Sequence, residues 1–181
     1  VEEAINLGAK ILIRVGTCGG ALKKEIKPGS IIIPTASIRE EGTTKEYLPS
    51  EFTAVADLEV ANALIQSAQK QNFKYFVGIN RTHDAFYGQS KNIKQWGSIY
   101  TNTRMKSWKF PLISSEMECA PLFLICLLRG VKAGAVLAVN ANPEPLKEIM
   151  ENKFEFDVPA SKIKTQEATA SIDRAIKTAL E

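Results

Sequence analysis

The chain has 181 residues, of which 45% are hydrophobic and 24% are charged. This composition is typical of a soluble globular protein, and the length suits one domain with a sizeable core, which argues against disorder. The formal net charge is only +3, and Lys and Arg are mixed with Asp and Glu along the chain. Such a balance gives no basic face, so we expect no nucleic-acid partner.

The cysteines and the single histidine limit redox and metal chemistry. Cys18, Cys119 and Cys126 have no CxxC spacing, and their odd number argues against a disulfide framework. A reducing compartment such as the cytoplasm is therefore favoured. Because His83 is the only histidine, we expect no zinc site and no other metal centre.

The sequence shows neither a membrane span nor a secretion signal. No apolar run approaches the ~18 residues that cross a bilayer, and the first residues lack the basic start and apolar core of a signal peptide. We therefore expect a cytoplasmic protein with no membrane partner. The chain opens at Val1, without an initiator Met, in what reads as the end of an amphipathic helix. We expect residues 1–181 to form a single domain that is truncated at its N-terminus.

The first predicted elements are a helix end and several strands. Gly8 follows the opening helical segment as a C-cap, and the apolar, β-rich residues 10–15 predict an interior strand. After a turn signal, residues 31–33 predict a second strand. Pro34 separates that strand from a further short one at residues 36–39.

The middle of the chain predicts a loop, a helix and a strand. Residues 40–52 read as a long loop, a kind of segment that often binds ligands. Asp57 is an N-cap for a helix that ends near Asn72. Residues 75–82 predict the next strand.

The last third predicts two strands and two helices. Residues 112–115 form a short predicted strand, and the almost wholly apolar residues 120–129 predict a helix packed on both sides, ended by Gly130. Residues 133–139 predict another buried strand, and apolar spacing over residues 161–180 predicts a closing amphipathic helix.

This alternation predicts an α/β fold of three layers, with helices on both faces of a central mixed, largely parallel sheet. Ligands of such folds bind outside the carboxyl ends of the strands. Three polar clusters each follow a predicted strand, at residues 14–20, 83–89 and 116–118. We expect these clusters to converge in one crevice.

The first cluster, RVGTCGG, carries an arginine into a predicted turn of glycine and threonine. The arginine fork can grip two oxygens of a phosphate, and glycines let backbone N–H groups approach an anion closely. The pattern therefore indicates an anion site. A turn with no ligand is the alternative.

Four motifs occur in one order: RVGTCGG at residues 14–20, EFTAVAD at 51–57, FYGQ at 86–89 and EME at 116–118. Together they resemble the nucleoside phosphorylase family, and uridine phosphorylases more than its other members. The likeness runs from about residue 10 to the end of the chain. It implies the three-layer fold and reversible phosphorolysis of a nucleoside, giving free base and ribose or deoxyribose 1-phosphate in nucleoside salvage. Inorganic phosphate is then a substrate, and no cofactor is needed.

The resemblance also concerns assembly and chain length. Family members form homo-oligomers built from dimers, with a hexamer expected and the sites at the dimer interface. They carry an N-terminal portion that contributes phosphate-binding arginines and a histidine for the neighbouring subunit. We expect this chain to lack that portion.

By resemblance, Arg14 and Thr17, with the backbone around Gly16 and Gly19, bind phosphate. The alternative for Arg14 is an ion pair with a carboxylate at the end of the sheet.

The EME motif supplies the sugar site by resemblance. Glu118 accepts hydrogen bonds from two ribose hydroxyls, Met117 packs on the sugar, and Glu116 assists. Alternatively, Glu116 and Glu118 only favour the positive end of the following helix, a reading that suits Glu116 better.

By resemblance, Phe86 stacks on the base, Gln89 presents a donor and an acceptor to it, and Lys91 donates to a base carbonyl. Uridine enzymes usually carry arginine where this chain has Lys91, and a second arginine where it has Ala141. Asn140 and Asn142 are candidate substitutes.

Two alternatives to uridine phosphorolysis stay open. Purine enzymes carry a catalytic aspartate near Ala141 that is not present, so purine activity would need Asn140 or Asn142 at the base. A non-catalytic protein that binds nucleosides or only assembles with partners is the other alternative. For His83 we favour a structural role over a catalytic one. Cys18 we interpret as a small packing residue.

Overall fold

The computed structural model describes residues 1–20, 25–86, 112–141 and 166–180. The predicted base-site residues Gln89 and Lys91 lie outside the described residues, as does Asn142.

A mixed sheet forms the centre of the molecule. Its strands are β1 (Ile11–Gly20), β2 (Ile31–Glu40), β3 (Ala54–Val55), β4 (Tyr75–His83), β5 (Leu112–Glu116) and β6 (Lys132–Ala141). The strand order is β3-β2-β4-β5-β1-β6, and β2 also pairs with β6. The β1/β6, β2/β4 and β4/β5 pairs are parallel, whereas β1/β5, β2/β3 and β2/β6 are antiparallel. The predicted mixed, largely parallel sheet is therefore confirmed, and the β2/β6 pairing closes it on itself.

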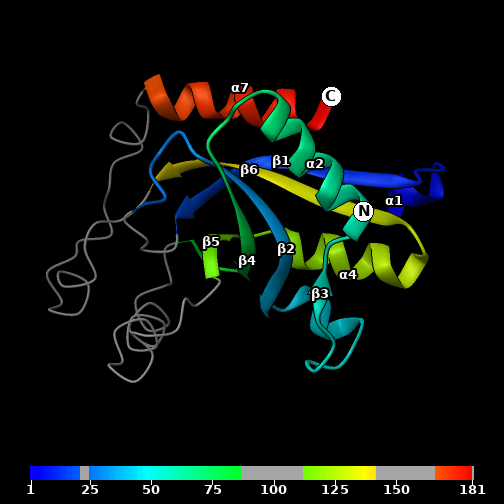
Figure 1. Cartoon of the computed structure of the whole chain (residues 1–181). Helices are drawn as coiled ribbons and strands as arrows, with labels where there is room; N and C mark the ends of the chain where they lie inside the picture. The colour runs from blue at the N-terminus through cyan, green and yellow to red at the C-terminus, as the bar shows by residue number, and fades with distance from the viewer. Residues whose placement is uncertain (21–24, 87–111, 142–165, 181) are drawn as a thin grey trace, which may run out of the picture.

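Helices cover both faces of the sheet, as Figure 1 shows. Helices α2 (Leu58–Lys70) and α7 (Gln166–Leu180) pack together on one face, and α4 (Cys119–Arg129) lies on the other. The short α1 (Glu2–Asn6) and the 3-10 helix η1 (Thr43–Glu46) complete the elements of the described ranges. The predicted three-layer α/β arrangement is confirmed.

Strand alternation builds two hydrophobic cores because successive side chains point to opposite faces. Ile31 and Ile33 pack with α2 and α7, while Ile32 packs with Phe123 and the rest of α4. Both core faces exclude water almost completely, since these isoleucines are 0% exposed.

Two glycines fix how helices meet the sheet. A Cβ at Gly134 on β6 would lie 2.5 Å from Val60 Cγ1, so the missing side chain lets α2 approach closely. Gly130 ends α4 in the left-handed region at φ 66°, as predicted.

Asp57 caps α2 by accepting a 3.1 Å hydrogen bond from the Val60 amide, which also confirms its predicted role.

The turn of glycine and threonine predicted after residue 15 is wrong, because β1 continues through it to Gly20. Along β6 the strand stays paired, with a bulge between Cys18 and Gly19, and β5 pairs with Gly19 and Gly20. Glycines in a strand often mark such a bulge rather than a chain reversal. The anion motif therefore lies on an extended strand.

The predicted break at Pro34 is also wrong. Strand β2 runs through this residue, and its register against β4 shifts between Pro34 and Ala36. A bulge accommodates a residue that has no N–H to donate, so the strand bends without ending.

The loop after β2 is anchored by one arginine. The Arg39 guanidinium donates to carbonyl oxygens of Thr44, Leu48, Pro49 and Phe52 at 2.6 to 2.8 Å, and to Thr44 Oγ1 at 2.8 Å. The predicted loop over residues 40–52 is therefore held against the end of β2. Within the described ranges, no helix is both long and apolar enough to cross a membrane.

Candidate functional site

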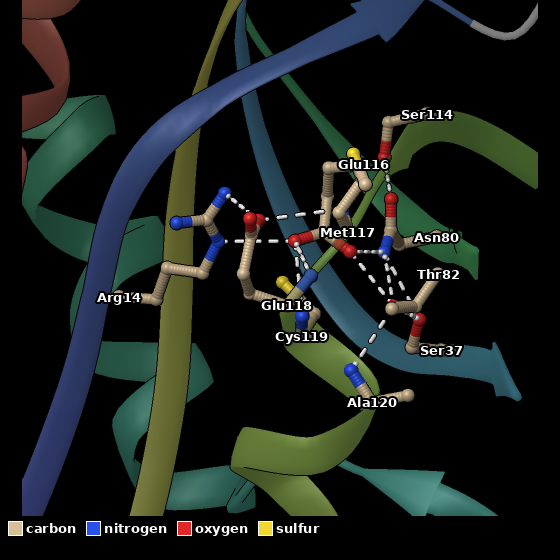
Figure 2. A network of polar contacts seen from close by, with 10 residues as sticks. All are labelled: Arg14, Ser37, Asn80, Thr82, Ser114, Glu116, Met117, Glu118, Cys119 and Ala120. Carbon is tan, nitrogen blue, oxygen red and sulfur yellow. Dashed lines mark hydrogen bonds and ion pairs between the residues drawn. The ribbon is translucent and has the colours of Figure 1, made fainter. Parts of the chain in front are cut away.

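Two of the predicted clusters meet on one side of the sheet. Strand β1 brings Arg14, while β5 and the start of α4 bring Glu116, Met117 and Glu118 (Figure 2). Arg14 Nε lies 3.0 Å from Glu116 Oε2, and Arg14 Nη2 lies 2.5 Å from Glu118 Oε2. One guanidinium thus joins two carboxylates that are two residues apart in the chain.

Glu116 Oε2 anchors both the arginine and the beginning of α4. Besides Arg14 Nε, it accepts hydrogen bonds from the backbone amides of Glu118 at 2.8 Å and Cys119 at 2.9 Å. These amides are among the groups that a helix leaves unsatisfied at its N-terminus. These contacts agree with the alternative considered for Glu116, namely that its carboxylate stabilises the positive end of the following helix.

Glu116 Oε1 is held by two buried side chains of β4. Asn80 Nδ2 donates to it at 2.6 Å and Thr82 Oγ1 at 2.7 Å. Glu116 is 5% exposed, and five donors from the described part of the chain surround its two oxygens. In this geometry it has no oxygen left for a sugar hydroxyl.

The contacts of Glu116 also set its charge. Burial alone raises its pKa, but the hydrogen bonds from Thr82 and the Glu118 amide, the charge of Arg14 and the hydrogen bond from Asn80 together outweigh burial. The pKa of Glu116 therefore lies below its ordinary value, and the carboxylate is ionised at neutral pH.

The polar network continues on the side of Glu116 that faces away from Arg14, as the right half of Figure 2 shows. Thr82 Oγ1 lies 2.7 Å from Ser37 Oγ and accepts a 3.0 Å hydrogen bond from the Ala120 amide. Asn80 Oδ1 accepts a 2.9 Å hydrogen bond from Ser114 Oγ. These four side chains, Ser37, Asn80, Thr82 and Ser114, are at most 3% exposed.

Arg14 is pressed against the backbone of its own strand. A Cβ built on Gly16 would lie 2.6 Å from Arg14 Cζ, so only glycine leaves room for the guanidinium in this position. Burial alone lowers the pKa of Arg14, but the neighbouring carboxylates, Glu116 first, reverse this and raise it. Arg14 thus remains a fixed positive charge, and the predicted alternative of an ion pair at the sheet end is observed.

Glu118 differs from Glu116 in its surroundings. Its side chain is 56% exposed, and it makes no side-chain cap although it occupies the N-cap position of α4. Apart from Arg14, its Oε2 accepts a 3.3 Å hydrogen bond from the Met117 amide. Glu118 is therefore the carboxylate of the pair that faces solvent.

The remaining predicted site residues in the described ranges are Thr17, Gly16, Gly19 and Phe86. Thr17 is half-buried on β1, Gly16 pairs with Leu137 on β6, and Gly19 pairs with Ser115 on β5. Phe86 follows β4 and is 58% exposed. The described contacts therefore join Arg14 to Glu116 and Glu118, and the base candidate Phe86 lies at the end of its described segment.

Two further predictions concern buried titratable groups. Cys18 is 4% exposed in the hydrophobic core and burial raises its pKa, so its interpretation as a packing residue is confirmed. His83 is 5% exposed, and burial first, then the charge of Arg81, lowers its pKa. In the ranges that the structure covers, no three His, Cys, Asp or Glu residues gather as a metal site.

Sequence reasoning missed the network of Ser37, Asn80, Thr82 and Ser114. The available signal was the polar pair Asn80 and Thr82, which alternates within a strand and therefore points to one face. Sequence pattern cannot tell that this face meets α4 and Glu116 instead of water.

Comparison with known proteins identifies the family of the chain. The sequence model of the phosphorylase superfamily matches residues 1–177. The chain therefore belongs to the phosphorylase superfamily, and the resemblance to nucleoside phosphorylases based on four motifs is confirmed.

The relatives include uridine phosphorylases from bacteria and archaea. The Treponema pallidum (strain Nichols) enzyme is 41% identical over 143 residues, which cover 78% of this chain and 55% of that protein. The uridine phosphorylase of Thermococcus kodakarensis is 37% identical, with 78% of this chain and 52% of that protein covered. The chain spans about half the length of these curated relatives.

Among solved structures, the purine nucleoside phosphorylase from Toxoplasma gondii in complex with immucillin-H is similar with a TM-score of 0.74. It is 27% identical, and the match covers 99% of this chain and 64% of that one. The Plasmodium knowlesi homolog of the Plasmodium falciparum enzyme has a TM-score of 0.65 and 32% identity, with 97% and 66% covered. These likenesses agree with the fold described above.

Proposed function

We propose that the protein carrying this chain catalyses reversible phosphorolysis of a nucleoside, with uridine as the expected substrate. The products are free base and ribose or deoxyribose 1-phosphate, and phosphate is a substrate, so no cofactor is required. One observation carries the proposal. Arg14 Nη2 lies 2.5 Å from Oε2 of the exposed Glu118, while both oxygens of the neighbouring Glu116 are occupied by hydrogen bonds within the protein.

This pair has the two charges that phosphorolysis needs. Phosphate attacks the anomeric carbon while the sugar gains positive character, so the site must hold an anion and fix the ribose. In our proposal the Arg14–Glu118 contact opens when substrates bind. The guanidinium then donates to phosphate oxygens, and Glu118 accepts hydrogen bonds from ribose hydroxyls.

The other assignments complete the proposed site. Thr17 and the backbone at Gly16 and Gly19 would bind phosphate, and Met117 would pack on the sugar. Because the contacts of Glu116 are occupied within the protein, we now propose that it orients Arg14 instead of assisting at the sugar.

For the base, Phe86 would stack on the ring, Gln89 would present a donor and an acceptor to its polar edge, and Lys91 would donate to a base carbonyl. The names of the relatives support uracil as the base.

Assembly and compartment are part of the same proposal. We expect residues 1–181 to act as one domain within a homo-oligomer built from dimers, with a hexamer as the family pattern. Exposed apolar residues of α7, Ile172, Ile176 and Leu180, suit a surface between subunits. The three free, buried cysteines suit a reducing cytoplasm.

The test is release of free base by the full-length protein with and without phosphate, from uridine and from inosine. We expect phosphate-dependent uracil release, and Arg14→Ala should reduce kcat/KM for phosphate about 100-fold or more, as expected for loss of a charged donor at a reacting anion. Arg129→Ala is the matched control because Arg129 also pairs with a glutamate, but on the surface.

Each contrary result removes a defined part of the proposal. Intact phosphorolysis in Arg14→Ala would refute the phosphate assignment. Faster reaction with inosine would favour the purine alternative, for which the likeness to purine nucleoside phosphorylase structures is the supporting observation. Base release that ignores phosphate would replace phosphorolysis by hydrolysis, and no release at all would favour the non-catalytic alternative.

A further inference from the structure

The buried side chains of Ser37, Asn80, Thr82 and Ser114 form a network around Glu116. They would not touch substrate, whereas Arg14 and Glu118 would. We propose that Thr82 and Asn80 are positioning residues that hold the Glu116 carboxylate in one rotation, so that it presents Arg14 and Glu118 together to phosphate and ribose. This inference rests on the proposed function for its kinetic consequences, while its structural core can be tested without catalysis.

The direction of the protons in the network follows from the donor inventory. The Thr82 hydroxyl has one proton, and Glu116 Oε1 at 2.7 Å can only accept when ionised. Thr82 oxygen then accepts from the Ala120 amide at 3.0 Å, and Ser37, whose hydroxyl can rotate, donates to it at 2.7 Å. The chain of donors therefore ends on Glu116.

The amide of Asn80 has one consistent orientation. Its Nδ2 donates to Glu116 Oε1 at 2.6 Å and to Ser37 Oγ at 3.0 Å, while its Oδ1 accepts from Ser114 Oγ at 2.9 Å. The reverse orientation would place an amide oxygen against the carboxylate, which is repulsive. Two fixed donors thus hold Oε1.

Fixing Oε1 also fixes what Oε2 does. With Oε1 held from β4, Oε2 is directed to Arg14 Nε and to the amides of Glu118 and Cys119. Rotation of the carboxylate would take this acceptor from the buried Cys119 amide and from two partly buried donors, which is costly. The same oxygen therefore sets the guanidinium and the backbone of the exposed carboxylate relative to each other.

Misalignment of Arg14 and Glu118 should lower kcat more than it weakens the binding of substrates. Reacting groups must be aligned closely, and small displacements lower kcat steeply. Loss of the Thr82 hydroxyl also removes a contact that lowers the pKa of Glu116, so this carboxylate should protonate at higher pH. A protonated Glu116 would no longer pair with Arg14 as an anion.

Other titratable groups around Glu116 must be separated from this effect. They are Arg14 and Cys18 on β1, His83 on β4, and Glu118 and Cys119 at the start of α4. Burial raises the pKa of both thiols and the carboxylates raise that of Arg14, so these three stay unchanged in acid. His83 and Glu118 can be followed separately by their own NMR signals.

The central experiment compares Thr82→Val, which removes the hydroxyl and keeps the shape, with Thr82→Ser, which keeps the hydroxyl. Thr44→Val is the matched control, because Thr44 is also 0% exposed and its hydroxyl also donates to a buried glutamate, in a separate network that contains Arg39. The readouts are kcat and KM for phosphate across pH, and the NMR titration of the Glu116 carboxyl with the Arg14 Nε signal.

We expect Thr82→Val to lower kcat about tenfold and to move both the acid limb and the Glu116 midpoint upward by about one pH unit. Thr82→Ser should retain most of the activity, and Thr44→Val should lower stability while leaving kcat and the acid limb unchanged. If Thr82→Val does not fold, Asn80→Ala removes the other donor to Oε1 and should shift the midpoint in the same direction.

Thr82→Val with normal kcat, acid limb and Glu116 midpoint would overturn the proposal, and so would equal kinetic effects of Thr44→Val. If the wild-type protein shows no phosphorolysis, the proposed function fails by itself. In that case a raised Glu116 midpoint and a displaced Arg14 Nε signal in Thr82→Val still support positioning, and unchanged signals still refute it.

Discussion

Two polar networks of this molecule share three residue types but have different surroundings. Each contains an arginine, a buried glutamate and a buried threonine: Arg14 with Glu116 and Thr82, and Arg39 with Glu41 and Thr44. Both glutamates are at most 5% exposed, and both threonines are 0% exposed. In each network a threonine hydroxyl donates to the glutamate, and an arginine contacts one of the two.

The partners of the arginines make the difference. Arg39 directs its donors to four backbone carbonyls and one hydroxyl of the loop after β2, which no ligand can replace without opening the loop. Arg14 directs its donors to two carboxylates, one of them 56% exposed. The first arginine is a structural clamp, whereas the second faces a partner with which a phosphate can compete. Residue type alone does not separate the two roles.

The largest expected effect tests the clamp. Arg39→Ala should lower the free energy of unfolding by about 3 kcal/mol, because five acceptors lose their donor together, among them the partly buried contacts to Leu48 and to both oxygens of Thr44. Urea denaturation measures this loss, and limited proteolysis should cut within residues 41–53. Arg39→Lys should recover only a part, since a lysine cannot reach acceptors in several directions. A loss below about 1 kcal/mol would remove the distinction between the two arginines.

The next largest effect tests whether the missing side chain at Gly16 makes room for the Arg14 guanidinium. Gly16→Ala should push the guanidinium from its two carboxylates and lower kcat/KM for phosphate about tenfold. The free energy of unfolding should change by less than about 1 kcal/mol, because Gly16 does not have a positive φ and alanine can adopt its backbone.

Gly134→Ala is the control for that variant. Its Cβ would collide with Val60 on α2, away from Arg14, and should cost about 1–3 kcal/mol of stability. The folded fraction should keep its activity. Full activity in Gly16→Ala would contradict the inferred position of Arg14.

A smaller effect concerns pH. The folded protein lowers the pKa of Glu116 below its ordinary value of 4.5, so ionised Glu116 adds stability that is fully present above about that pH. This contribution is lost as pH falls through the lower folded pKa. The difference in unfolding free energy between wild type and Glu116→Gln should therefore narrow from neutral pH into acid, measured by urea denaturation. A constant or growing difference would contradict an ionised, network-bound Glu116.

The smallest effect comes from an arginine at the surface. Arg129 pairs with Glu2 at 2.7 Å, yet their side chains are 49% and 34% exposed. Exposed ion pairs contribute little because water and salt screen them. Arg129→Ala should leave Tm unchanged within measurement error, and a clear decrease would show that contact alone, without burial or several acceptors, is enough to make an arginine structural.

Much of this arrangement could be predicted from sequence. Local signals located the helix caps at Asp57 and Gly130, the strands at Tyr75 and Leu112, and the polar residues Glu116 and Glu118 at the end of a strand. These predictions succeeded because capping, periodicity and charge act within a few residues of the chain.

Other features could not be predicted in this way. The glycine motif became part of β1 because β6 and β5 are available as partners, and β2 passed through Pro34 because a bulge fits against β4. Both outcomes depend on strands distant in sequence, whereas the turn signals of glycine and proline are local.

By itself, the amino-acid sequence determined the alternating elements, the family and the identity of the charged groups, since these depend on short patterns and motif order. Only the tertiary structure decided that Glu116 is enclosed by β1, β4 and α4 while Glu118 faces solvent. The physical reason is that burial and hydrogen-bond partners come from several distant segments at once, so two identical side chains two residues apart acquire different environments.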